Sequence, residues 1–289
     1  MTITISTSCL HAQISPKGAE LIRLQDERGR DLLWSGDPAV WAGRSPLLFP
    51  IVGGVRDDRI RVDGVDFPMR RHGFARTSTF EVIETDPSAC RLRLTSSDAT
   101  WHAYPFDFVL EVAYRVEDAT LAVTAAVTNP GQRPLPVSFG FHPAFRWPLP
   151  YGGSKEEHEI RFERPEPAPI RRLEGALIGR EARRSPIAGH QLVLRDELFE
   201  RDALILDQVA SRSVEYGVPG LRSIRVTFPA MPHLGIWTKP GANFICIEPW
   251  HGYASPEEFE GEFADKPGMT LVPPGESTAF AMGISITAV

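Results

Sequence analysis

Three short segments of the chain combine ionisable side chains with glycine, proline and aromatic residues. They are residues 70–76 (RRHGFAR), 139–145 (FGFHPAF) and 246–252 (CIEPWHG). In the second segment His142 precedes Pro143, and a residue before proline favours extended backbone, so this imidazole should be held near the end of a strand. Histidine is the side chain whose ordinary pKa lies nearest to neutrality. His142 is therefore suited to proton transfer.

Glu248 follows the apolar residues 244–247 in the third segment. A glutamate is rarely buried without a partner, and a histidine is a suitable one. If Glu248 meets one or two histidines in a cleft, the carboxylate can take a proton while an imidazolium gives one, which is general acid/base catalysis. Near neutrality we expect Glu248 to stay ionised and His142 to be at least partly protonated, because each stabilises the charged form of the other. Four other histidines are expected to be ordinary surface or core residues: His11, His102, His158 and His190.

Zinc is an alternative partner for such side chains. The chain has no HExxH or His-x-His motif, and zinc bound by histidine and glutamate usually needs three fixed donors. Cys9, Cys90 and Cys246 are odd in number and lack CxxC spacing, which argues against a disulfide framework and a zinc ribbon. We therefore expect no metal site, and we expect the cysteines to be buried thiols.

The elements that must position these side chains are mostly β-strands. Apolar and polar residues alternate with a period of two in many short stretches, and turn-forming residues separate these stretches. The clearest predicted strands are residues 2–6, 91–95, 108–114, 121–127, 224–228 and 280–286. Helices and strands do not alternate along the chain, so a parallel doubly wound sheet is disfavoured. The pattern predicts an all-β sandwich with few short helices, and we expect one domain over residues 1–289.

Two further regions have a local prediction. Residues 255–258 (SPEE) place serine, proline and glutamate in the order of a helix N-cap, first turn and capping box, which predicts a short helix. Residues 165–184 contain several prolines and arginines without any period, which predicts a long surface loop.

Charge and hydropathy exclude several kinds of partner. The 289 residues include 37 acidic and 31 basic side chains, a formal net charge of -6, so no general positive field exists to attract nucleic acid. No apolar run approaches the roughly 18 residues that a membrane-spanning helix needs. The N-terminus also lacks the basic and apolar regions of a secretory signal. We expect a cytoplasmic protein with no nucleic-acid or membrane partner, either a monomer or a homodimer.

Several short motifs, taken in order along the chain, carry a resemblance to a known family. They are residues 31–34 (DLLW), Trp41, 46–53 (PLLFPIVG), 72–76 (HGFAR), 104–108 (YPFDF), 140–145 (GFHPAF) and 247–250 (IEPW). With these motifs the chain resembles the aldose 1-epimerase, or galactose mutarotase-like, superfamily over most of its length. The resemblance implies a large antiparallel β-sandwich with a sugar bound in a cleft on its concave face. It also implies an isomerase of small sugars that needs no cofactor, because neither electrons nor groups are transferred.

The resemblance also implies roles for individual residues. Glu248 matches the general base that takes the proton from the anomeric hydroxyl, and His142 matches the acid that protonates the ring oxygen. His72 matches a second active-site histidine that holds and polarises the sugar. Arg56 and Asp202 match positions that bind sugar hydroxyls.

The identity of the sugar stays open at this stage. The family's usual Pro-Tyr-Phe-Asn after the second histidine is replaced by residues 143–146 (PAFR), as in a shorter bacterial branch. Six arginines cluster between positions 56 and 76: Arg56, Arg59, Arg61, Arg70, Arg71 and Arg76. They could bind a phosphorylated sugar, because the arginine fork pairs well with phosphate, although a solvated hairpin explains them as well. The leading hypothesis is an aldose 1-epimerase of a free hexose. The alternatives are a hexose-6-phosphate 1-epimerase and a carbohydrate-binding protein without turnover.

Overall fold

The computed structural model describes residues 2–287, which form an antiparallel assembly of many strands with one short α-helix, α1 (Asp98–Trp101). Within those residues there are also 3₁₀ turns at Arg56–Asp58, Ala75–Thr77, Lys155–Glu157, Asp196–Phe199 and Phe263–Asp265. The predicted all-β fold is confirmed, and each of the six predicted strands overlaps an observed strand. No helix in the described part of the chain is long and apolar enough to cross a membrane.

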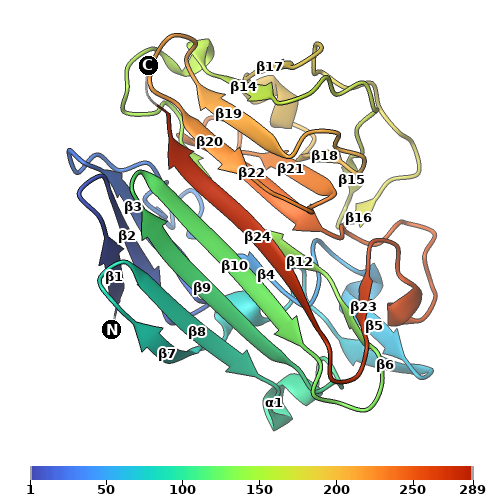
Figure 1. Cartoon of the computed structure of the whole chain (residues 1–289). Coiled ribbons are helices and arrows are strands. Elements are labelled where there is room, and N and C mark those ends of the chain that lie inside the picture. Colours follow the sequence, from blue (N-terminus) through green and yellow to red (C-terminus); the bar gives the residue numbers. More distant parts are fainter. Residues whose placement is uncertain (1, 288–289) are drawn as a thin grey trace.

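The larger sheet has nine strands that lie side by side across Figure 1. In spatial order they are β17 (Gln191–Val193), β14 (Glu159–Phe162), β19 (Ser213–Gly217), β20 (Ile224–Thr227), β24 (Ser277–Ile286), β10 (Thr120–Thr128), β9 (Val109–Glu117), β8 (Ala89–Thr95) and β7 (Glu81–Thr85). Along β10 the residues Leu121, Val123, Ala125 and Val127 are buried and the residues between them are more exposed. One face of this sheet therefore packs on the core and the other faces solvent.

The second sheet has six strands and carries the candidate site. Its strands are β18 (Leu204–Leu206), β21 (His233–Trp237), β22 (Phe244–His251), β12 (Phe139–Phe141) and β4 (Leu47–Leu48), with β13 (Ala144–Arg146) also paired to β22. Phe139 of β12 stacks on Phe280 of β24 with ring centroids 5.2 Å apart, which is a direct contact between the two sheets. Ile245 and Ile247 of β22 join the same hydrophobic core. The two sheets thus form the two layers of a sandwich.

Smaller sheets and hairpins complete the fold. They are β1 (Ile3–Ser6), β2 (Leu10–Ser15) and β3 (Glu20–Asp26) in one sheet, and the pairs β5 (Arg59–Val62) with β6 (Val65–Pro68), β11 (Leu135–Val137) with β23 (Thr270–Val272), and β15 (Leu173–Glu174) with β16 (Leu177–Ile178). The sheet of β1 to β3 packs against β8, β9 and β10. Because residues from Ile5 to Ile286 share one hydrophobic cluster, the N-terminal sheet and the C-terminal strand stabilise the same core.

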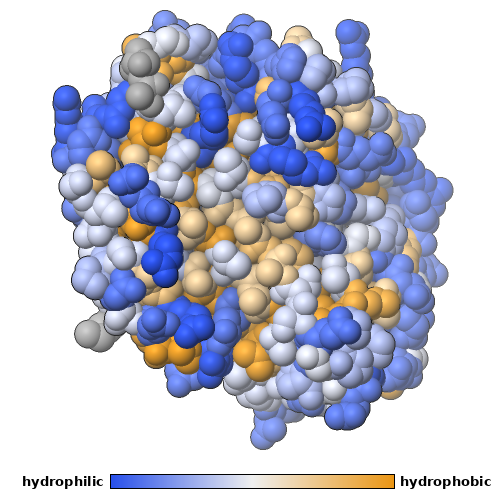
Figure 2. Space-filling model, viewed as in Figure 1, coloured by the Kyte–Doolittle hydropathy of each residue, from blue (hydrophilic) through white to orange (hydrophobic). Residues whose placement is uncertain are grey.

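Figure 2 shows the outer face of the molecule in the same view, with a pale, weakly hydrophobic band across its middle and hydrophilic residues around it. This band follows from the outward side chains of β10 and β24, which are small: Ala122, Thr124, Ala126, Ala279, Ala281 and Gly283. The exposed face of the nine-stranded sheet therefore has few charges along its central strands.

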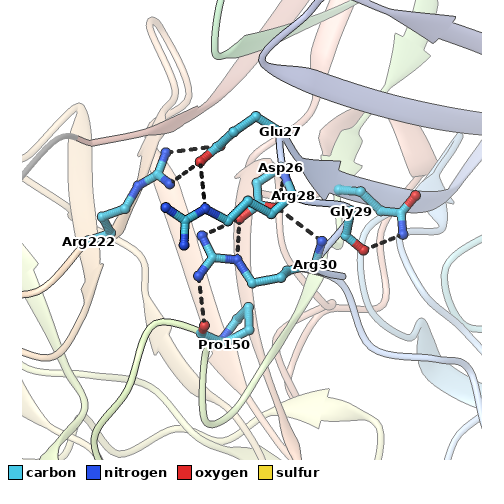
Figure 3. A network of polar contacts seen from close by, with 8 residues as sticks. Asp26, Glu27, Arg28, Gly29, Arg30, Pro150 and Arg222 are labelled. Carbon is cyan, nitrogen blue, oxygen red and sulfur yellow. Dashed lines mark hydrogen bonds and ion pairs between the residues drawn. The ribbon is translucent and has the colours of Figure 1, made fainter.

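A polar network ties the turn after β3 to two distant loops (Figure 3). Asp26 is fully buried, and its carboxylate accepts hydrogen bonds from the backbone N–H and the side chain of Arg30. Arg30 also donates to the carbonyl oxygen of Pro150. Glu27 pairs with Arg222 at 2.6 Å, and this ion pair lowers the pKa of Glu27 to about 2. A buried carboxylate is stable only with such partners, so the network fixes how these three loops meet.

The prediction of a helix at residues 255–258 is wrong. The backbone there is instead used in pairing with another segment: Ile178 donates to Ser255, and Glu257 donates to Ile178. Only one turn forms, in which Phe259 donates to Pro256. Tertiary pairing has therefore overridden the local capping signal. The predicted loop at 165–184 is irregular for most of its length but contains the short β15–β16 hairpin.

Candidate active site

A cavity of about 320 Å³ opens on the face of the six-stranded sheet that points away from the core. Its walls include both predicted catalytic histidines, the glutamate, an aspartate and two arginines: His72, His142, Glu248, Asp202, Arg71 and Arg76. Three tryptophans also line it: Trp41, Trp237 and Trp250. This volume lies at the lower end of the roughly 300–1,000 Å³ that is typical of small-molecule sites.

Strand β22 explains why Glu248 reaches the cavity. Side chains two residues apart on a strand share a face. Ile245 and Ile247 point into the sandwich core, so Cys246 and Glu248 must point to the opposite face. Loops cover that face, and Glu248 is 1% exposed. The strand thus places a carboxylate in an interior position that is open only to the cavity.

Trp250 lies on the same face as Glu248, two residues further along β22. Its indole ring lies over Gly235 of β21 and Gly140 of β12, the strands on either side of β22. A Cβ atom at Gly235 would lie 2.4 Å from the ring, and one at Gly140 would lie 2.7 Å from it. No other residue type leaves room for the indole at these points. The two glycines therefore let Trp250 lie flat beside Glu248 as part of the cavity wall.

His142 comes directly after β12, as its position before Pro143 predicts. Its Nε2 atom lies 3.1 Å from Oε2 of Glu248, although the two groups are not aligned as in a good hydrogen bond. Poor alignment of this kind is common before a substrate is bound. The ring of Trp41 stacks on His142 with centroids 5.2 Å apart, which holds the imidazole in place.

His72 lies in a tight turn after β6. Both His72 and Gly73 have a positive φ of 68°, and a Cβ atom at Gly73 would lie 2.2 Å from the carbonyl oxygen of Phe49. The left-handed conformation of His72 is maintained by two hydrogen bonds to Gly53: His72 N–H donates to the Gly53 carbonyl, and Gly53 N–H donates to Nδ1 of His72. A neutral His72 must therefore carry its proton on Nε2, where it is available to a ligand.

Burial decides the protonation of the central pair. Burial raises the pKa of the Glu248 carboxyl well above its usual range, while nearby Arg71 opposes this. Burial also lowers the pKa of the His142 imidazole to about 3. The expectation of an ionised Glu248 beside a partly protonated His142 is thus wrong in direction, because loss of solvation outweighs mutual attraction. Burial favours the neutral acid and the neutral imidazole in the Glu248–His142 pair.

Asp202 and two arginines form the polar side of the cavity. Arg71 lies 3.9 Å from the Asp202 carboxylate, which is longer than a hydrogen bond. Arg76 donates to the backbone carbonyl of Arg71, and burial lowers the pKa of Arg76, with the nearby charge of Arg71 adding to the effect. Asp202 has a positive φ of 63°, and its side chain accepts from the N–H of Ala203.

Arg56 does not reach this cavity. It lines a separate hollow together with Arg59, Arg61 and Lys266, and its side chain donates to the backbone carbonyl of Glu257. The structure therefore divides the arginine cluster seen in the sequence. Arg59 and Arg61 lie on the exposed β5–β6 hairpin, whereas Arg71 and Arg76 line the cavity.

Several polar atoms of the cavity have no partner within residues 2–287. They are Arg71 Nε, His142 Nδ1, Glu248 Oε2 and Trp250 Nε1. Buried polar atoms are normally hydrogen-bonded, so their gathering here indicates a site for a polar ligand. Indole faces beside hydrogen-bonding side chains suit a ligand that has both apolar faces and hydroxyl groups.

Sequence reasoning missed three features of this site. Trp41 appeared only as part of a motif, and its stacking on His142 depends on a loop whose path has no sequence period. Arg71 directly precedes His72, and its place beside the histidine in RRHGF is the signal that could have separated it from the exposed arginines. Cys246 was also overlooked as a neighbour of the pair: its sulfur and the ligand atoms of His142 and Glu248 all lie within 4.8 Å of one another.

Comparison with known proteins finds relatives that span the chain. A family model for aldose 1-epimerase matches residues 1–284. The chain is 31% identical over 298 residues to the chromosomal protein LacX of Lactococcus lactis subsp. lactis, covering 99% of each. It is similar to a galactose mutarotase related enzyme from Lactobacillus acidophilus, at 27% identity and a TM-score of 0.92 over 100% of this chain and 98% of that one. It is also similar to a galactose mutarotase-like protein from Lactobacillus casei, at 28% identity and a TM-score of 0.92 over 99% of this chain and 100% of that one. The chain therefore belongs to the aldose 1-epimerase family.

Proposed function

We propose that this protein is a cytoplasmic aldose 1-epimerase that interconverts the α and β anomers of a hexose by acid/base ring opening. The observation that carries the proposal is the contact between Glu248 Oε2 and His142 Nε2 at 3.1 Å on the wall of a cavity that is also lined by arginine, aspartate and tryptophan side chains. Ring opening needs one proton removed from the anomeric hydroxyl and one delivered to the ring oxygen. A carboxylate and an imidazolium in contact supply both transfers.

The proton count of the pair matches the proposed reaction. Glu248 as carboxylate takes the anomeric proton while His142 as imidazolium protonates the ring oxygen and the C1–O5 bond breaks. The pair then consists of a neutral acid and a neutral imidazole, which is the form that burial favours. The open aldehyde turns about C1–C2, and the reverse transfers close the ring on its other face. No proton need be exchanged with solvent, and no cofactor takes part.

The other cavity residues hold the sugar in this scheme. His72 donates from Nε2 toward the ring oxygen region, because its Nδ1 already accepts from Gly53. Arg71 and Asp202 bind hydroxyls on the polar side of the cavity. Trp250 and Trp237 offer indole surface to the apolar face of the ring.

Polarimetry tests the proposal. Freshly dissolved α-D-glucose or α-D-galactose should reach its equilibrium rotation faster with the protein than without it. Glu248→Gln removes the base while keeping the shape of the side chain, so the acceleration should disappear. An unchanged rate for every free aldose and sugar phosphate would overturn the proposal. If a sugar bound without being turned over, the protein would be a carbohydrate-binding member of the family.

A hexose-6-phosphate 1-epimerase is the second candidate, and one observation favours it. Arg71 and Arg76 both line the cavity, and Arg71 lies no closer than 3.9 Å to the carboxylate of Asp202. Two guanidinium groups on one cavity wall suit a phosphate. Acceleration with glucose 6-phosphate that exceeds the acceleration with glucose, and that falls in Arg76→Gln, would favour this candidate.

A further inference from the structure

The catalytic pair has a third potential metal donor directly beneath it. Cys246 lies two residues before Glu248 on β22, so the two side chains share the face that bears the cavity. The thiol is fully buried among small and aromatic residues, and the cysteine is free. A thiol, a carboxylate and an imidazole together are zinc-binding groups.

The geometry of the three donors is close to that of a zinc site. The ligand atoms of His142, Cys246 and Glu248 all lie within 4.8 Å of one another, and His142 Nε2 and Glu248 Oε2 are 3.1 Å apart. Donors around a tetrahedral zinc ion are about 3.3–3.8 Å apart, given zinc–donor distances of roughly 2.0–2.3 Å. Movement of about 1 Å by the thiol would complete three bonds. The fourth position would face the cavity, because His142 and Glu248 line it.

Two further observations point to a ligand at this place. Glu248 is 1% exposed, yet its Oε2 atom has no hydrogen-bond partner within residues 2–287. The charges also balance, since a thiolate and a carboxylate together cancel the charge of a divalent ion. The nearby guanidinium groups of Arg71 and Arg76 would then face a neutral centre rather than a new cation.

We propose that His142, Cys246 and Glu248 form a binding site for a thiol-seeking divalent cation such as Zn²⁺, and that the ion inhibits the enzyme by occupying the acid and the base. On binding, the zinc–sulfur bond forms as the thiol proton leaves to solvent. The proton held by the Glu248–His142 pair leaves as well, and no oxidation or reduction occurs. The inhibition rests on the proposed function, whereas the site itself rests only on the three donors.

Metal binding is measured directly, without turnover. Titration calorimetry with Zn²⁺ in a buffer free of thiols and chelators should show one ion bound per chain. Titration with Cd²⁺ should produce the ultraviolet band of a cadmium–thiolate bond. In Cys246→Ala the band should be absent and the zinc affinity should fall by at least about tenfold, since even loss of a group outside the ligand shell costs that much. Alanine fits there because Ala144 and Ala242 are neighbours in the same cluster.

Two further variants complete the design. Cys90→Ser is the matched control: Cys90 is also buried and free but lies on β8 of the other sheet, so zinc binding should be unchanged. Glu248→Gln provides a second test if Cys246→Ala folds poorly, because it removes a donor while keeping the shape, and its zinc affinity should fall likewise. Equal zinc affinity in the native protein and in either donor variant would overturn the proposal. Zinc binding without any sugar turnover would leave the site standing and overturn only the proposed function.

Discussion

The two sheets of the sandwich differ in how their strands use their two faces. In β10 and β24 of the nine-stranded sheet, buried and more exposed residues alternate, because one face meets the core and the other meets solvent. In β22 of the six-stranded sheet, residues 244–250 are all buried, because loops cover the second face. Burying a polar side chain on that covered face costs free energy, and Glu248 is such a side chain. A polar residue in a strand with two buried faces therefore marks function more clearly than one in a half-exposed strand.

The largest expected effect is a loss of activity without a loss of stability, caused by a substitution in β22. Glu248→Gln should lower the rate of mutarotation by about 10²- to 10⁴-fold, the usual contribution of acid/base catalysis, while the melting temperature does not fall. Polarimetry and thermal unfolding check the two parts. A melting temperature that drops with the activity would show that Glu248 acts on the fold rather than on the substrate.

A core substitution in the nine-stranded sheet should have the opposite result: lower stability with unchanged activity. Leu121→Ala in β10 removes a fully buried side chain and should lower the free energy of unfolding by about 2–5 kcal/mol. The kinetic constants of the protein that remains folded should not change. Ala122→Ser, one residue along on the outward face, is the control and should change stability by less than about 0.5 kcal/mol. Urea unfolding measures both, and equal effects would contradict the alternation of faces.

Gly235 tests whether the close approach of Trp250 shapes the cavity. A methyl group in Gly235→Ala would overlap the indole and force it to move, so we expect a loss of about 1–3 kcal/mol in the free energy of unfolding and a higher KM for the sugar. Adding Trp250→Phe, which shortens the ring, should restore part of the stability. If Gly235→Ala melts like the native protein, the ring is not held against the strand.

The smallest expected effect concerns the proton on Glu248. Above about pH 6.5 an unfolded chain holds almost no proton on Glu248 or His142, whereas the folded chain keeps the Glu248 proton to higher pH, because burial raises the folded pKa of Glu248. The folded chain thus binds more protons, and the pair's contribution to the free energy of unfolding should fall by about 1.4 kcal/mol per pH unit as pH rises toward the raised pKa. In Glu248→Gln this decline should be absent. Unfolding curves at pH 6.5, 7.5 and 8.5 compare the two proteins, and parallel pH profiles would refute a raised pKa of Glu248.

The half-exposed strands could be predicted from the sequence because their pattern reports burial directly. The strands predicted at 108–114, 121–127 and 280–286 are observed with the expected alternation, over residues 109–117, 120–128 and 277–286. The helix at 255–258 was mispredicted because its capping pattern is local, whereas the backbone there pairs with Ile178, a segment almost 80 residues earlier in the chain. The short helix α1, at Asp98–Trp101, was not predicted.

The candidate site was predicted in part. The buried position of Glu248 followed from the apolar residues before it, and its need for a partner pointed to a histidine. The position of Arg56 outside the cavity could not be foreseen, because it depends on the path of the 3₁₀ turn at Arg56–Asp58 and its contact with Glu257. The protonation of the pair depends on the exact degree of burial, which no single-sequence pattern reports.

The order in which the cavity residues occur along the chain has a consequence for biosynthesis. The wall needs His72, His142, Asp202 and Glu248, and β24, which ends at Ile286, pairs with β10 in the middle of the large sheet. A nascent chain on the ribosome would hold all four of these residues before the last strand is made and can pair with β10. If mutarotation activity is recovered after dilution from denaturant, the rate of its recovery should therefore report the pairing of the last strand, β24, rather than the formation of the first hairpins.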